Sequence, residues 1–513
     1  MKKLPIGIQT LSNIIDDGYV YVDKTAVALD LIQKGKYYFL SRPRRFGKSL
    51  FLDTLKEIFK GNRPLFQNLY IEDKWDFSTT YPVLRISFGT GFIGEVAAFD
   101  AYIRWVLLEV EKDLDIQCVA REQDAKAYFR ELIWKAQEKY QQKVVILIDE
   151  YDKPILDNIT DSVKAKGIRD ILKDFYTIIK NNDAYIQFVF ITGVSKFSKM
   201  NLFSGLNNLN DITIDGQFGN ICGYTHQELK SNFGSYLQGV DLEKVKRWYD
   251  GYNYFGDKVY NPFDILLFFS NNKEFRNYWW STGNPSFLID LLKEKEYYLP
   301  ALLNYIASEE ILNSFDVDSI ELEALLWQTG YLTIARKIEA PFGMLYELEI
   351  PNKEIQTSLT SLFITYLTGE RTQKIATQHQ LTKVLQTADT DRFKEILINL
   401  FASIANNNYT RNSIADYEGY YASVLYAYLV SLGFPVISED VTNKGRIDLS
   451  LQLPDKVYIF EFKVVQKAMG KALQQIKKKQ YYQKYQTGKP IYLIGIEFGK
   501  TERNIVTWVV EEK

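Results

Sequence analysis

Four short apolar runs, separated by longer amphipathic stretches, constrain the fold of this chain more than any other feature. The runs are rich in Val, Ile, Phe and Tyr: Tyr37–Leu40, Val83–Phe88, Val144–Ile148 and Ile186–Thr192. Strands that are apolar throughout need cover on both faces, and their alternation with helical patterns indicates a parallel sheet between helices. We therefore expect residues 1–212 to form an α/β domain.

The pattern changes twice after residue 212. Residues 213–375 show mainly helical periodicity with a short hairpin within 331–350, which predicts a lid-like or winged-helix-like second domain. Residues 376–513 return to an α/β pattern, which predicts a separate third domain. Its expected elements are a helix, two strands, a Lys-rich helix and another strand: Glu418–Gly433, Ile447–Leu453, Val457–Val464, Ala468–Tyr485 and Ile491–Ile496.

Composition excludes several kinds of chemistry. Only two His and two Cys occur among 513 residues. These numbers argue against a disulfide framework, a four-cysteine zinc site and most His-based catalysis. We expect chemistry that uses carboxylates, Lys, Arg and an oxygen-preferring cation such as Mg²⁺.

Charge is uneven along the chain. The net charge is −2, but residues 440–513 contain 14 Lys or Arg against 8 Asp or Glu, so we expect nucleic acid to bind the C-terminal part. The N-terminus has no continuous apolar run, and the longest apolar stretch, Ala422–Phe434, is far shorter than the ~20 residues of a membrane span. We expect a cytoplasmic protein without a membrane partner, and self-association stays open.

A candidate phosphate loop follows the first apolar run. Gly47, Lys48 and Ser49 stand where an amphipathic helix begins, and free backbone N–H groups at a helix start bind phosphate. Lys48 would reach the β- and γ-phosphates, and the Ser49 hydroxyl would bind Mg²⁺. The first glycine of the usual pattern is absent, since position 42 is Arg42. A Gly-Lys-Ser sequence that merely opens a helix is the alternative.

Two further apolar runs end in polar residues. Asp149 and Glu150 close the third run, and Thr192 closes the fourth. Because ligands bind at the carboxyl ends of parallel strands, Asp149 would hold Mg²⁺ through water and Glu150 would deprotonate the attacking water. Thr192 would sense the γ-phosphate, with Lys196 as a weaker candidate. The alternatives are a strand that ends in solvated acids and a plain strand-to-loop exit.

A second carboxylate site is predicted near the C-terminus. Asp448 lies on one strand, and Glu461 and Lys463 are two residues apart on the next, so they share one face. A hairpin would bring Asp448 beside Glu461, giving two carboxylates that can share Mg²⁺. Lys463 would activate water or stabilise charge on a phosphate. The alternative is an amphipathic hairpin with a solvated salt bridge.

Longer segments resemble a known family. They are YVDKT, FLSRPRRFGKS, LIDEYD, TGVSKFSK and LFSGLNNL, and they look like the AAA-ATPase-like domain of a large, mostly uncharacterised bacterial family. RPRRFGKS is that family's form of the phosphate loop, so the resemblance accounts for Arg42 and adds Arg45 and Phe46 to the expected ATP-binding residues. The family's domain is usually followed by a PD-(D/E)XK nuclease domain, whose pattern Asp448, Glu461 and Lys463 match.

The nuclease resemblance adds two accessory residues, and the Lys-rich helix offers a third. Glu418 matches an acid that completes the metal site in related proteins, although the helix dipole alone favours an acid there. Gln475 matches a helix position that contacts the site or the backbone, and its alternative is a solvated helix face. Lys478, between Lys477 and Lys479, would contact backbone phosphates or only aid solubility.

These expectations combine into one function with one alternative. The chain would be an AAA-like P-loop protein that binds ATP, with a Mg²⁺-dependent phosphodiesterase domain that cuts nucleic acid, expected to be DNA, under control of the nucleotide state. The alternative is a nucleotide-dependent switch or scaffold whose nuclease-like domain binds nucleic acid without cutting it.

Overall fold

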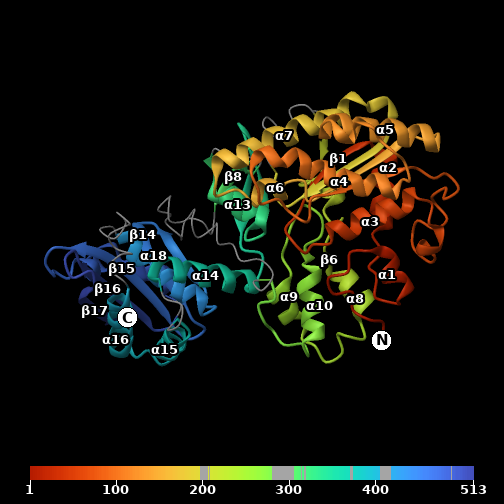
Figure 1. Ribbon diagram of the computed structural model, residues 1–513. Coiled ribbons are helices and arrows are strands. Elements are labelled where there is room, and N and C mark those ends of the chain that lie inside the picture. Colours follow the sequence, from red (N-terminus) through yellow and green to blue (C-terminus); the bar gives the residue numbers. More distant parts are fainter. Residues whose placement is uncertain are drawn as a thin grey trace. The chain divides into compact units, whose positions relative to one another are not determined.

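A computed structural model describes residues 1–196, 206, 208–279, 305–312, 315–316, 319–369, 374–404, 418–486 and 488–513. The chain forms two compact units (Figure 1). The first comprises Met1–Trp279 and Ile306–Asn352, and the second includes Lys353–Lys513. Most of the expected middle domain therefore belongs to the first unit, and the boundaries after residues 212 and 375 stay predictions.

The first unit contains a parallel sheet. Its five strands are β1 (Tyr37–Ser41), β2 (Val83–Ser87), β3 (Val144–Asp149), β4 (Ile186–Gly193) and β5 (Asn210–Asp211). They run in the order β2-β3-β4-β1-β5, with every neighbouring pair parallel. The four predicted strands and their parallel arrangement are confirmed. Because β4 lies between β1 and β3, the carboxyl ends of these three strands are adjacent.

Helices cover both faces of this sheet, as its apolar strands require. One group packs together: α4 (Phe99–Asp113), α5 (Ala125–Tyr140) and α7 (Ser162–Asn181). Another group consists of α1 (Leu11–Asp16), α2 (Thr25–Lys34) and α3 (Lys48–Phe59). Figure 1 shows α5 and α7 on the opposite side of the strands from α3.

The rest of the first unit is mainly helical, as expected. Its helices include α8 (His226–Phe233), α9 (Leu242–Tyr249) and α10 (Pro262–Ser270). Val20 and Val22 from the N-terminal segment share one apolar core with these helices. The predicted hairpin is confirmed as β11 (Thr333–Ala340) and β12 (Gly343–Glu349), which pair antiparallel.

The second unit contains the C-terminal sheet, in the order β13-β14-β15-β16-β17. Its strands are Val436–Thr442, Gly445–Gln452, Val457–Val465, Ile491–Gly499 and Ile505–Glu512. Only β15 and β16 pair in parallel. The sequence predicted β14, β15 and β16, whereas β13 and β17 were missed.

Helices lie on both faces of the C-terminal sheet. On one face, α16 (Thr390–Ser403) supplies Phe393, whose ring packs against Phe460 of β15. On the other face, α19 (Lys471–Lys479) packs on β15 and β16. The expected helix over Ala468–Tyr485 is wrong in extent: Gln480 has a φ of 52°, which ends α19, and a short 3₁₀-helix follows.

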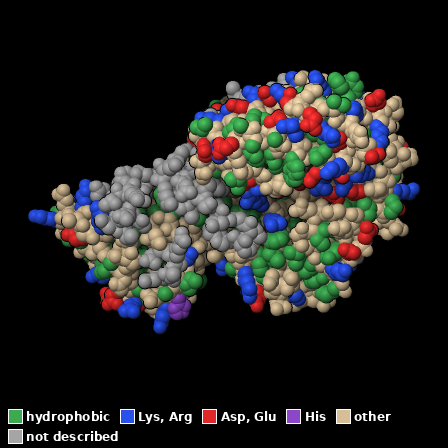
Figure 2. Space-filling model, in the orientation of Figure 1, with side chains coloured by type: hydrophobic (Ala, Val, Ile, Leu, Met, Phe, Trp, Pro, Cys, Tyr) green, Lys and Arg blue, Asp and Glu red, His purple; other side chains and the backbone are tan. Residues whose placement is uncertain are grey.

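Basic, acidic and apolar side chains are interspersed over the first unit on the face shown in Figure 2. In the part of the chain that the structure describes, no helix joins the length and the apolar character that crossing a membrane requires.

Candidate functional sites

The loop between β1 and α3 has the backbone that a phosphate site needs. Gly47 caps the start of α3 with a φ of 96°, and Arg45 is also left-handed, with a φ of 68°. A Cβ at Gly47 would meet no atom within 4 Å, so the glycine is required by the backbone conformation and not by space. The N–H groups at the start of α3 are therefore presented at an open position.

Lys48 is folded back into its own loop. Its Nζ donates to the backbone oxygens of Arg42 at 2.9 Å and Pro43 at 3.0 Å. Burial lowers the pKa of Lys48, and the charges of Asp149 and Glu150 partly oppose this shift. No carboxylate forms an ion pair with Lys48 within the described ranges. Its ammonium group is thus held by neutral carbonyls.

Arg42, at the position of the missing glycine, does not project into the loop. Its guanidinium is buried and donates to the backbone oxygens of Ser41, at 2.9 Å, and Thr213, at 2.7 Å. It also lies 3.6 Å from the centre of the Tyr254 ring. Arg42 therefore ties the phosphate loop to residues that follow the sheet.

The other predicted ATP-binding residues of this loop differ in exposure. Phe46 is buried, with its ring edge-to-face against Tyr252 at 4.7 Å. Arg45 is exposed, with its guanidinium 4.8 Å from the Phe263 ring centre. Ser49 is half-buried in the first turn of α3. Their roles in binding nucleotide stay predictions.

Asp149 and Glu150 lie at the carboxyl end of β3, close enough for their charges to act on Lys48. Asp149 is only 3% exposed, and its Oδ1 has no hydrogen-bond partner among the described residues. Burial, and next the charge of Asp149, raise the pKa of Glu150. A buried carboxylate oxygen without a partner is costly, so Asp149 fits a site that a bound cation completes.

The neighbouring strand contributes Thr192, whose hydroxyl donates to the backbone oxygen of Leu40 at 2.9 Å. This bond joins β4 to β1, and the sensor role of Thr192 stays a prediction. Lys196 forms an ion pair with Asp211. The segment 197–205, with Lys199 and part of the LFSGLNNL motif, lies outside the described residues.

Asp152 was missed as a site residue. Its Oδ2 accepts hydrogen bonds from the N–H groups of Val194, at 3.0 Å, and Ser195, at 2.6 Å, and from the Ser195 hydroxyl at 2.6 Å. Asp152 thereby fixes the chain that leaves β4. The third acid of LIDEYD was the available signal.

In the second unit, the carboxylate site comes together around β14 and β15. The N–H of Phe462 donates to Asp448 Oδ2 at 2.8 Å, which joins the two strands at the site. Lys463 Nζ donates to Glu418 Oε2 at 3.1 Å and lies 3.8 Å from Glu461 Oε1. The structure therefore brings the four predicted residues Glu418, Asp448, Glu461 and Lys463 together.

Burial shapes the electrostatics of this site. It raises the pKa of both Asp448 and Glu461, and the charge of Asp448 raises that of Glu461 further, while Lys463 opposes both shifts. Glu461 is fully buried, and its Oε2 has no partner in the described part of the chain. This oxygen fits a cation ligand.

Mg²⁺ here would depend on ligands besides protein carboxylates. The described residues contain no group of three or more His, Cys, Asp or Glu arranged to hold a metal ion. Asp448 and Glu461 would therefore supply two ligands, with water and substrate oxygens completing the octahedral shell that Mg²⁺ prefers. Glu418 is engaged by Lys463, so its role as a metal ligand stays a prediction.

Helix α19 and the turn after it supply further contacts. Gln475 Nε2 donates to Glu461 Oε1. Tyr481 was missed: it is buried, and its pKa is raised by burial and by the charges of Glu461 and Asp448, which places it at the site. Lys478 is exposed on α19, and its phosphate contact stays a prediction.

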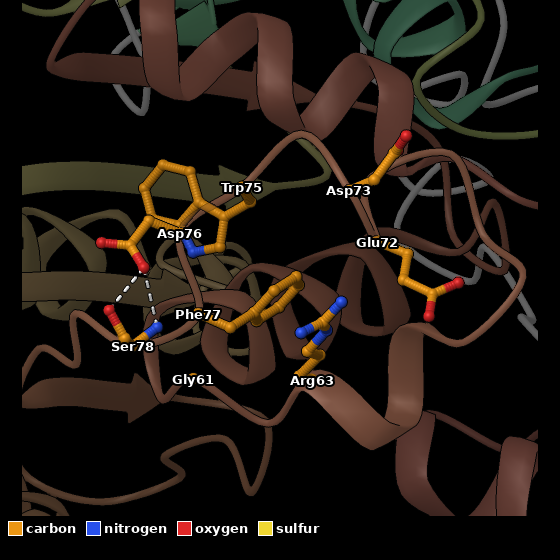
Figure 3. A pocket seen from close by; sticks show the side chains of 8 residues that line it. All are labelled: Gly61, Arg63, Glu72, Asp73, Trp75, Asp76, Phe77 and Ser78. Atoms are coloured by element: carbon orange, nitrogen blue, oxygen red, sulfur yellow. Dashed lines mark hydrogen bonds between the residues drawn. The ribbon is translucent and has the colours of Figure 1, made fainter.

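The first unit also has a surface hollow that contains neither the phosphate loop nor the acidic residues at the end of β3. Its volume is about 390 Å³, and Figure 3 shows Asp76 turned toward Ser78 at its side. It is lined by Gly61, Arg63, Glu72, Asp73, Trp75, Asp76, Phe77 and Ser78. None of the predicted nucleotide-binding residues contributes to it, so we place no nucleotide there.

Comparisons with known proteins identify two domains in the chain. Residues 5–203 match a family described as predicted AAA-ATPase, and residues 416–508 match the PD-(D/E)XK nuclease superfamily. Fold and matches together define a predicted ATPase joined to a nuclease-superfamily domain.

The chain is also 47% identical, over 99% of both chains, to a protein of Azotobacter chroococcum mcd 1 named "Uncharacterized protein in vnfD 5'region". The chain belongs to the same family as this relative, and it carries a predicted AAA-ATPase domain and a C-terminal domain of the PD-(D/E)XK nuclease superfamily.

Proposed function

We propose that the first unit binds and hydrolyses ATP with Mg²⁺. Two observations carry this proposal: among the described residues, the buried Lys48 has only backbone carbonyls as hydrogen-bond partners, and the buried Asp149 Oδ1 has no partner. Lys48 would leave Arg42 and Pro43 for the phosphates, and Ser49 and Asp149 would hold the cation. Glu150, whose pKa burial raises, would accept a proton from the attacking water.

We place the adenine beside the phosphate loop. An apolar cavity of about 60 Å³ adjoins Gly47, with Tyr21, Leu50 and Tyr224 among its lining residues. The cavity is smaller than a purine, so the base would have to widen it. Its apolar lining suits a base, which leaves the charged Lys48 to the phosphates.

The C-terminal site is proposed to cut phosphodiester bonds in nucleic acid. Mg²⁺ bound there would favour ionisation of water and stabilise charge on a phosphate. Asp448 and Glu461 would hold it, and Gln475 would keep Glu461 in its orientation. Lys463 would orient the nucleophile or stabilise the phosphate, and the positive charge of this part of the chain would attract the nucleic-acid backbone.

ATP is proposed to gate this cleavage. Within the first unit, Arg42 contacts Tyr254 and Phe46 contacts Tyr252, so a change in the phosphate loop reaches beyond the sheet. These contacts would carry a change of nucleotide state from the phosphate loop to the part of the first unit that follows the sheet.

A switch or scaffold without cleavage is the second candidate. The observation that favours it is that Lys48 Nζ is bound to the backbone oxygens of Arg42 and Pro43, and both hydrogen bonds must break before Lys48 reaches a nucleotide. A loop of this kind would suit slow exchange between two states.

Cleavage of supercoiled plasmid by the full chain with Mg²⁺, with and without ATP, tests the proposal. The wild type is expected to cut, with a rate that depends on ATP, and the Asp448→Ala/Lys463→Ala variant is expected not to. Equal behaviour of the two chains under every condition would remove the nuclease function. Mg²⁺-dependent ATP turnover that is lost in Glu150→Gln would argue against a passive switch.

A further inference from the structure

A buried acid outside the predicted site caps the helix that carries Gln475. Glu497 lies on β16 and is fully buried. Its carboxylate accepts hydrogen bonds from the N–H of Met469, at 2.8 Å, and from the N–H of Lys471. The N-cap residue of α19 is Gly470, which has no side chain to serve this purpose. Glu497 therefore satisfies, from a neighbouring strand, N–H groups that a helix start leaves open.

The surroundings of Glu497 favour its ionised form. Burial acts to raise its pKa, but hydrogen bonds from the N–H groups of Met469, Gly470 and Lys471 and from the Thr507 hydroxyl hold the pKa below its ordinary value. Helix α19 thus begins at a fixed negative charge, which the helix dipole favours.

A close backbone approach holds the same helix. A Cβ on Gly495 would lie 2.4 Å from the backbone nitrogen of Leu473, so only glycine allows α19 to lie this near β16. In the strand register, Gly495 pairs with Glu461 and Glu497 pairs with Lys463. The start of α19 is therefore docked on β16, next to the stretch of β15 that carries Glu461 and Lys463.

We propose that Glu497 is a positioning residue of this site. By fixing the start of α19, it keeps the Gln475 amide on Glu461 Oε1 and so leaves Glu461 Oε2 available for a divalent cation. Glu497 is not itself a ligand, because its two oxygens accept the N–H groups of Met469, just before α19, and of Lys471, its first residue. This inference rests on the metal site of the proposed function.

Calorimetric titration of the nucleotide-free full chain with Mn²⁺ tests the inference without relying on activity. Because Asp149 of the first unit is also a candidate cation ligand, only the binding that is lost in Asp448→Ala is taken as binding at the C-terminal site. Glu497→Gln is expected to weaken Mn²⁺ binding about 10-fold or more, the range known for residues that orient metal ligands. In a Gln475→Ala background the same change is expected to add little, since both residues act through one hydrogen bond. A merely structural role would instead give additive losses.

Two further variants keep the test sharp. Asp389→Asn removes another helix-capping carboxylate of the second unit, whose Oδ1 accepts the Arg392 N–H at 3.0 Å, and is expected to leave Mn²⁺ binding unchanged. Glu497→Asp keeps the charge on a shorter side chain and serves if Glu497→Gln does not fold. It is also expected to weaken Mn²⁺ binding, because the shorter side chain does not reach both N–H groups.

Each outcome has one meaning. If folded Glu497 variants bound Mn²⁺ as tightly as wild type, the positioning role of Glu497 would be wrong, while the proposed cleavage would stand. Additive losses would show that Glu497 does not act through Gln475. A wild type that binds Mn²⁺ but cuts no nucleic acid would remove the proposed cleavage and leave the inference in place. A wild type that takes up no Mn²⁺ would overturn both.

Discussion

Lys48 and Lys463 belong to the two predicted phosphate-handling sites, yet their surroundings are opposite. Lys48 donates to two neutral carbonyls, and burial lowers its pKa. Lys463 is bound to Glu418 and lies near Glu461. Burial alone would lower the pKa of Lys463 as well, but the charges of the surrounding carboxylates outweigh burial and raise that pKa.

This difference indicates what each site receives. The charge of Lys48 is not balanced by an ion pair among the described residues, which suits an incoming anion such as a triphosphate. The charge of Lys463 already balances carboxylates, and Glu461 Oε2, which has no partner in the described ranges, suits an incoming cation. We infer that Lys48 binds an incoming anion, whereas Lys463 keeps the carboxylates of a cation site close together.

The largest expected effect tests the C-terminal side of this comparison. Asp448→Ala is expected to slow plasmid cleavage by about 10³-fold or more, because a site built on two carboxylates loses one and with it several kcal/mol of metal-assisted stabilisation. Initial cleavage rates measure the loss. Asp455→Asn, in the exposed turn between β14 and β15, is the matched control and is expected to cut normally. Equal rates in wild type and Asp448→Ala would contradict the assignment.

The next effect concerns hydrolysis in the first unit. Glu150→Gln removes the expected general base and is expected to slow ATP turnover by about 10²-fold or more while binding is kept. Phosphate release measures turnover, and a fluorescent ATP analogue measures binding. Unchanged turnover would show that Glu150 is not the base. Glu138→Gln, an exposed position on α5, serves as the control.

A smaller effect is expected for affinity. Lys48→Ala removes charge-assisted hydrogen bonds worth about 1.5–3 kcal/mol, so ATP binding is expected to weaken about 10- to 100-fold. Lys60→Ala, an exposed lysine just after α3, should bind ATP like wild type. If Lys48→Ala bound ATP as tightly as the control, the phosphate would lie elsewhere.

The smallest effect is a pH dependence of stability. Because burial raises the pKa of Asp448 and Glu461, their contribution to folding is present at acid pH and is lost as pH rises through the raised values. Without divalent cations, the second unit is expected to unfold a few degrees lower at about pH 8 than at about pH 5. Differential scanning calorimetry measures this shift.

Two controls sharpen that measurement. Asp448→Asn should flatten the pH dependence, since it removes one of the titrating groups. Mg²⁺ should protect more at the higher pH, because metal ligands must be deprotonated. An equal pH dependence in Asp448→Asn and wild type would contradict the proposed electrostatics.

Much of the fold could be predicted from the sequence, because continuous apolar runs report burial on both faces. The strands over Tyr37–Leu40 and Val144–Ile148 appear within one residue of their predicted ends. The strand β13 was missed because it has exposed and acidic positions, and its stability comes from pairing with β14. The break at Gln480 was missed because no glycine or proline marks it.

The candidate sites also combine residues that local sequence patterns predicted with residues that they missed. Spacing along one strand sufficed to place Glu461 and Lys463 on one face, since side chains alternate with a period of two. The contacts of Arg42 with Thr213 and of Glu497 with Met469 join residues far apart in sequence. Local patterns carry no information about such polar contacts, which depend on how the elements pack.

The most direct test is a structure of the full chain with Mg²⁺ and a non-hydrolysable ATP analogue. We expect a triphosphate on Lys48, with Nζ released from Arg42 and Pro43, and a separate cation touching Asp448 and Glu461 Oε2. Lys48 still bound to its own loop at saturating analogue, with no cation between the two carboxylates, would contradict this expectation.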